Sequence, residues 1–137
     1  MPAVNYIAVV LAALSAFVLG GLWYSPMLFA KKWMVYAGIE CGEDGQPKGG
    51  NMAVIFGGAF VLNLIAAWVL AMFLGTMPLK YAALAGLSVG LCWVSTSLGL
   101  NYLFERRPLG LWLINSGYFV LQFTIMGAII GAFNPAG

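Results

Sequence analysis

The sequence contains 137 residues, of which 63% are hydrophobic and only 7% are charged, and its formal net charge is +2. Such a small polar share cannot coat a water-soluble surface, which excludes an ordinary soluble domain and indicates a protein embedded in the lipid bilayer. The six basic and four acidic residues lie in short segments between apolar runs rather than along one stripe, which argues against nucleic-acid binding.

Four apolar segments are long enough to cross a membrane. An α-helix rises about 1.5 Å per residue, so about 20 residues cross a hydrocarbon layer of roughly 30 Å. We therefore predict an all-α, polytopic membrane protein that forms a single transmembrane domain over residues 1–137. Its predicted helices are residues 4–24, 52–74, 81–104 and 109–133, with a polar loop over residues 27–51. The first segment is too long for a signal-peptide core and no basic residue precedes it, so we expect it to be retained.

Two pairs of segments resemble each other, which predicts an internal repeat. Residues 58–63 (GAFVLN) match residues 117–122 (GYFVLQ) at an offset of 59 positions. The other two segments match at an offset of 75 positions, which pairs Tyr6 with Tyr81 and residues 28–32 with residues 103–107. Segments one and three run in the same direction across the membrane. We therefore predict two parallel helical hairpins related by a pseudo-twofold axis along the membrane normal.

The basic residues are distributed unequally between the two ends of the predicted helices. Lys80 alone flanks one end, and five residues flank the other: Lys31, Lys32, Lys48, Arg106 and Arg107. Because loops rich in Lys and Arg stay in the cytoplasm, we predict that residues 27–51 and 105–108 are cytoplasmic and that both termini are outside.

The titratable residues give no support to catalysis or proton coupling. The sequence has no histidine, and its carboxylates, Glu40, Glu43, Asp44 and Glu105, lie in loops or at a helix end. Proton-coupled carriers hold an ionisable group inside the membrane, and enzymes of the bilayer need a general base or a metal cluster. The three loop carboxylates lack the alternation of a calcium loop. We therefore predict no metal site and no cofactor, and the sequence argues against an enzyme.

Neutral polar side chains are the remaining candidates for a site. Helical spacing places Asn115, Tyr118 and Gln122 on one side of the fourth segment. Lipid cannot satisfy amide groups, so these side chains should point into the bundle, either as interhelical contacts or as the lining of a solute route. The candidate residues are Asn63, Ser95, Thr96, Asn101, Asn115, Tyr118 and Gln122.

Small residues predict faces for close helix packing. Gly86 and Gly90 form a small-xxx-small pair, and a second set in the same segment recurs at three- and four-residue steps: Ser88, Cys92, Ser95 or Thr96, and Gly99. The fourth segment has small residues opposite its polar side. With only four short helices to bury these faces, we expect a homo-oligomer in the lipid bilayer, or another membrane partner.

A charge cluster, Glu105, Arg106 and Arg107, precedes Pro108 and the fourth segment. We expect Pro108 to occupy the first position of that helix. The cluster has two interpretations: it fixes the turn, which we favour, or it docks anionic headgroups or a partner.

Two functions from different classes fit these features. The first is a structural or accessory membrane subunit whose polar residues join helices. The alternative is a small oligomeric channel or facilitator for a neutral or anionic small solute, without proton coupling. Direct amide bonds in a sealed core favour the first, and a continuous hydrated path favours the second.

Several motifs resemble those of a known family. They are residues 21–26 (GLWYSP), 104–108 (FERRP), 117–118 (GY) and 126–131 (MGAIIG), and their order and spacing resemble the DUF1761 family along nearly the whole chain. The resemblance implies four transmembrane helices and a bacterial cytoplasmic membrane. It implies no activity and no binding residue.

Overall fold

The computed structural model describes residues 4–43 and 49–134, and its described elements are helices. They are α1 (Tyr6–Trp23), α2 (Ala30–Ala37), α3 (Met52–Leu74), α4 (Leu79–Ser88), the π-helical η1 (Val89–Val94), α5 (Ser95–Glu105) and α6 (Leu109–Ala132). Because α4, η1 and α5 form one continuous helix, four helices are long and apolar enough to cross a membrane: Tyr6–Trp23, Met52–Leu74, Leu79–Glu105 and Leu109–Ala132. The all-α fold and the four predicted spans are confirmed.

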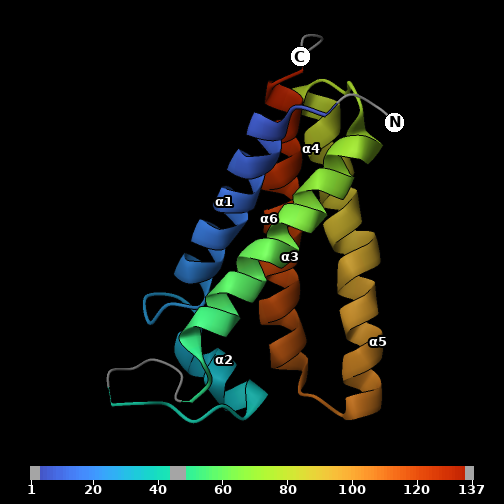
Figure 1. Cartoon of the computed structure of the whole chain (residues 1–137). Helices are drawn as coiled ribbons and strands as arrows, with labels where there is room; N and C mark the ends of the chain where they lie inside the picture. The colour runs from blue at the N-terminus through green and yellow to red at the C-terminus, as the bar shows by residue number, and fades with distance from the viewer. Residues whose placement is uncertain (1–3, 44–48, 135–137) are drawn as a thin grey trace.

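The bundle is built around α6. Figure 1 shows α1 on one side of α6, the continuous helix α4–η1–α5 on the other, and α3 crossing the bundle diagonally. α1 begins and α6 ends at the same end of the bundle, whereas α2 and the α5–α6 turn lie at the opposite end. α6 contacts each of the other helices, so it is the central helix of the bundle.

Local residue chemistry sets the helix ends. Asn5 caps α1 by accepting a hydrogen bond from the Ala8 N–H, and Asn51 caps α3 by accepting from the Ala53 and Val54 N–H groups. Gly38 ends α2 in the left-handed conformation, at φ 72°. Pro108 is the N-cap of α6, one position before the place expected for it.

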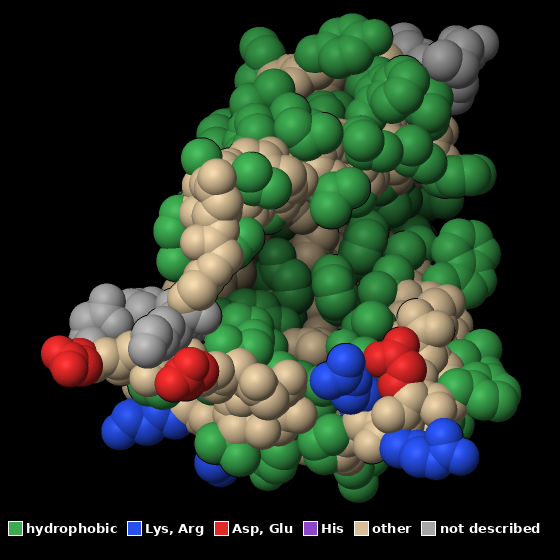
Figure 2. Space-filling model, turned by 60° about the horizontal axis from the view of Figure 1, so that its bottom comes forward, with side chains coloured by type: hydrophobic (Ala, Val, Ile, Leu, Met, Phe, Trp, Pro, Cys, Tyr) green, Lys and Arg blue, Asp and Glu red, His purple; other side chains and the backbone are tan. Residues whose placement is uncertain are grey.

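Charged side chains gather at the end of the bundle that carries α2 and the α5–α6 turn. Figure 2 shows this end, with Lys, Arg and Glu side chains along its rim and a central hollow whose walls are mainly hydrophobic. Of the charged residues that the structure describes, Lys80 alone lies at the start of α4, at the opposite end. The unequal distribution of basic residues found in the sequence therefore corresponds to the two ends of the bundle. Asp44 and Lys48 lie outside the described residues.

Glycines let α4 and α6 approach backbone to backbone. A Cβ atom at Gly86 would overlap the Phe123 carbonyl oxygen, and one at Gly90 would lie 2.7 Å from the Phe119 carbonyl oxygen. On α6, a Cβ atom at Gly127 would overlap the Ala82 carbonyl oxygen. The predicted close approach of a second helix to Gly86 and Gly90 is confirmed. Gly86, Gly90 and Gly127 are therefore used for packing within the chain.

The π-helical turn η1 was not predicted, and it changes which residues of the third span face the bundle. Ser95 is buried and its hydroxyl donates to the Gly90 carbonyl, five residues earlier, at 2.7 Å. A π-turn inserts one residue and rotates the following helix. Within the described chain Gly99 packs against Trp112, whereas three other members of the second predicted set lie exposed, namely Ser88, Cys92 and Thr96.

The two halves of the chain share a direction but differ in local structure. α1 ends at Trp23 and α2 starts separately, whereas the corresponding helix in the second half runs without a break to Glu105. In addition, α1 packs on both α3 and α6, whereas α4 packs mainly on α6. The internal repeat therefore stays a prediction.

Adding a methyl group at the α4–α6 contact should destabilise the bundle. We expect Gly86→Ala to lower the free energy of unfolding in detergent by about 1–3 kcal/mol, because the two backbones must separate. Gly57→Ala is the matched control, since a Cβ atom at Gly57 meets nothing within 4 Å. In that helix alanine should be neutral or stabilising by up to ~1 kcal/mol. Equal stability of the two variants would contradict the packing described.

Candidate functional site

A contact between two carboxamides joins α3 and α6. Gln122 is 2% exposed, and its Nε2 donates to Asn63 Oδ1 at 3.1 Å and approaches the Met126 sulfur at 3.6 Å. Asn63 lies near the middle of α3 and is half-buried. The two carboxamides occupy equivalent positions of the predicted repeat, 59 residues apart. They bond to each other rather than to separate groups.

A tyrosine joins α6 to α1 beside this pair. The Tyr118 hydroxyl donates to the Ala16 carbonyl at 3.0 Å. Gly20 leaves room for this hydroxyl, since a Cβ atom there would lie 3.2 Å from it. The polar side of α6 therefore makes its second contact with a different helix.

Asn115 makes the third contact and joins three segments. Its Oδ1 accepts from the Tyr24 hydroxyl at 2.6 Å, and its Nδ2 donates to the Tyr102 hydroxyl at 2.8 Å. Tyr24 follows α1 and Tyr102 belongs to α5. The Tyr24 ring also contacts the Tyr118 ring, with centroids 5.5 Å apart. The α1, α5 and α6 helices are thus connected near the end that carries the charge cluster.

Sequence reasoning did not identify the two tyrosines that bond Asn115. Tyr24 has the position of an aromatic belt residue at a membrane interface, and nothing in the spacing of Tyr102 singles it out. The one available signal is chemical, because a carboxamide in a span needs both a donor and an acceptor. Tyr hydroxyls can supply either.

The remaining candidates do not join this network. Ser95 is buried, but its hydroxyl donates to the Gly90 carbonyl within the π-turn. Thr96 is exposed and donates to the Cys92 carbonyl in the preceding turn at 2.7 Å. Asn101 is exposed on α5, and its side chain has no hydrogen bond to another described residue. The structure therefore brings together four of the candidates, Asn63, Asn115, Tyr118 and Gln122, and leaves three apart.

Indole groups add two more bonds between segments. Trp23 Nε1 donates to the Ile114 carbonyl at 2.9 Å, and Trp112 Nε1 donates to the Ser95 carbonyl at 2.9 Å. These bonds fix the end of α1 and the start of α5 to α6. The Trp23 ring also explains why a glycine occupies position 117, because a Cβ atom at Gly117 would lie 2.9 Å from that ring.

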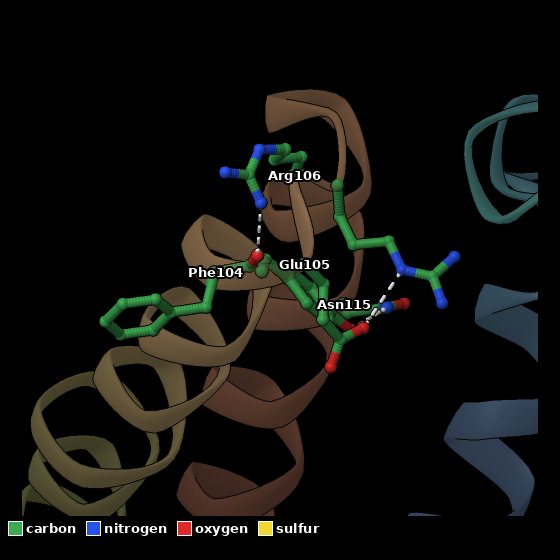
Figure 3. Close-up of polar contacts among 6 residues, drawn as sticks. Phe104, Glu105, Arg106 and Asn115 are labelled. Carbon is green, nitrogen blue, oxygen red and sulfur yellow. Dashed lines mark hydrogen bonds and ion pairs between the residues drawn. The ribbon is translucent and has the colours of Figure 1, made fainter.

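The charge cluster lies at the α5–α6 turn, close to Asn115 (Figure 3). Arg107 Nε donates to Glu105 Oε1 at 3.1 Å, and Arg106 Nη1 donates to the Phe104 carbonyl at 3.2 Å. These side chains are exposed, so the ion pair contributes at most about 1 kcal/mol. Within the described residues, no group of three or more His, Cys, Asp or Glu side chains could hold a metal ion.

Breaking the Asn63–Gln122 contact should weaken the bundle. We expect Asn63→Leu and Gln122→Leu each to lower the free energy of unfolding by about 1–2 kcal/mol, because each leaves a carboxamide without its partner. Gln122 Oε1 already lacks a hydrogen-bond partner within the described structure, so Asn63→Leu costs Gln122 its only carboxamide contact. The double variant should lose less than the sum of the two.

Asn101→Leu is the control for this experiment, since it makes the same exchange at an exposed carboxamide without a described hydrogen bond. It should cost no stability. Denaturant titration in a mild detergent measures all four proteins. Unchanged or higher stability of the Asn63 and Gln122 variants would show that their side chains do not hold the helices together.

The comparisons with known proteins agree with the resemblance seen in the sequence. No curated protein and no solved structure matches the chain. One family model, described as a protein of unknown function (DUF1761), matches residues 7–131. Because that match covers nearly the whole chain, the protein belongs to the DUF1761 family.

Proposed function

We propose that the protein is a structural or accessory subunit of a membrane assembly, and that its polar side chains are interhelical contacts. The observation that supports this function is the direct pairing of the carboxamides inside the spans. Asn63 and Gln122 bond to each other, and Asn115 bonds to two tyrosines. The donors and acceptors that form these bonds are not free to coordinate a passing solute, as the lining of a channel must.

The surface of α3 supports assembly with a second copy of the chain. The buried residues of α3 lie between Ala67 and Leu74, and most of the preceding side chains are exposed. Leu62, for example, is 68% exposed. A helix whose fully buried residues occupy only one third of its length leaves a long apolar face, and helix association in a bilayer proceeds through such packing contacts. We propose a homo-oligomer in which α3 of one copy contacts α3 of another.

The unequal distribution of basic residues supports an orientation for this assembly. The end with α2 and the α5–α6 turn would face the cytoplasm, and both termini would lie outside. The membrane would be the bacterial cytoplasmic membrane.

Cross-linking in native membranes tests the proposed contact. In a background with Cys41 and Cys92 replaced by Ser, Leu62→Cys should give a disulfide-linked dimer on mild oxidation. Val18→Cys on α1 is the matched control, because Val18 is 69% exposed and Leu62 is 68% exposed. It should stay monomeric. Equal cross-linking of both variants, or of neither, would contradict an α3 interface.

A flux measurement distinguishes the structural function from the alternative channel or facilitator. Liposomes containing the purified protein should release neutral polar and anionic solutes no faster than protein-free liposomes. Release that depends on the protein and is reduced by Asn115→Leu or Gln122→Leu would instead assign these residues to a solute route.

A further inference from the structure

A groove between α2 and the α5–α6 turn lies at the charged end of the bundle. It has a volume of about 510 Å³, and its lining includes Tyr36 and Gly38 of the α2 segment and Glu105, Arg106 and Arg107 of the turn. That volume falls within the roughly 300–1,000 Å³ of small-molecule pockets. We infer that this groove binds the phosphodiester group of an acidic phospholipid headgroup.

The two arginines retain donors for such a group. A guanidinium carries five N–H donors. Among the described contacts, Arg106 uses one of them on the Phe104 carbonyl, and Arg107 uses Nε on Glu105. In Figure 3, Arg106 lies on the outer side of the turn, away from Asn115. Its remaining N–H groups are thus not part of the network inside the span. Arginine is well suited to phosphate oxygens because two parallel N–H groups can bond them together.

The backbone of Arg106 indicates that its side chain is used for more than the turn. Arg106 has φ 59° and is the one non-glycine residue in the described part of the chain with a positive φ. It ends α5, and the Arg106 and Arg107 N–H groups donate to the Leu103 and Tyr102 carbonyls. Glycine is the residue that adopts this conformation without steric cost. An arginine in this conformation lowers stability relative to glycine. This cost points to a function for the charge of Arg106.

The surroundings place the groove at the depth of lipid headgroups. Leu103, Phe104 and Leu109 flank the turn and are 77%, 80% and 70% exposed. Apolar side chains this exposed at the ends of two membrane-spanning helices face acyl chains, so the arginines next to them lie at the headgroup level.

Charge favours an acidic lipid over a zwitterionic one. Two arginines and one glutamate give the groove a net charge of +1, which a single phosphodiester neutralises. The positive end of α6 adds to this field, since its N-cap Pro108 provides no side-chain cap. A zwitterionic headgroup would bring an additional cation close to the arginines.

Binding of short-chain phosphatidylglycerol to the purified protein in an uncharged detergent tests the inference. The parent protein should bind phosphatidylglycerol more tightly than short-chain phosphatidylcholine. Arg106→Gly should weaken phosphatidylglycerol binding about tenfold, the loss of one charge-assisted contact. Because glycine suits the backbone of this turn, the melting temperature of Arg106→Gly should be no lower than that of the parent. Arg107→Gln should weaken binding similarly.

Lys32→Gln is the matched control, because it removes one positive charge from the same end of the molecule, outside the groove. It should change phosphatidylglycerol affinity by less than about twofold, as screening of an exposed charge predicts. Parent-like binding by Arg106→Gly, or an equal loss in Lys32→Gln, would overturn the site. Inorganic phosphate that binds as tightly as phosphatidylglycerol would overturn its assignment to lipid.

Discussion

A carboxamide inside a bilayer must find its hydrogen-bond partners within the protein, because lipid offers none. This constraint accounts for the arrangement of helices around α6. Its polar side carries Asn115, Tyr118 and Gln122, and each of them bonds to a different set of neighbours. Together they reach α1, α3, α5 and the segment after α1. Three side chains at helical spacing thus fix most of the bundle.

The opposite side of α6 contacts its neighbour through close packing of small residues rather than through hydrogen bonds. Glycines there and in the third span let α4 approach until backbone atoms meet. Small residues that permit such an approach gain dispersion contacts, which drive helix association where no hydrophobic effect operates. One helix therefore combines a directional side with a close-packed side. This combination explains why α6 contacts every other helix, whereas the fully buried residues of α3 occupy only one third of its length.

Much of this fold could be predicted because hydropathy and length determine which segments cross a bilayer. The inward position of Asn63, Asn115 and Gln122 followed from the cost of an unpaired amide. The π-turn could not be predicted, because one inserted residue leaves the hydropathy of a span unchanged while it rotates everything after it. The π-turn places Ser95 on the buried face next to Gly90, whereas the adjacent Thr96 lies exposed.

The partners of the site were harder to predict than its members. Tyr24 and Tyr102 bond Asn115 from segments far apart in the sequence, and this pairing depends on how the helices cross rather than on any local pattern. The position of Asn101 shows the same limit, since its carboxamide resembles that of Asn115 in type but lies on the outer face of α5. Residue type predicts the need for a partner, and tertiary packing decides which partner is available.

The most direct test of the central claim is solid-state NMR of the protein in lipid bilayers with isotope-labelled glutamine and asparagine. The sequence has only two glutamines, Gln46 and Gln122, and only Gln122 lies in a span, which simplifies assignment. We predict a through-space contact between the Gln122 and Asn63 carboxamides and no magnetisation transfer from water to Gln122. Strong transfer from water to Gln122 and Asn115, without the Asn63 contact, would contradict an interlocked bundle and indicate a hydrated route.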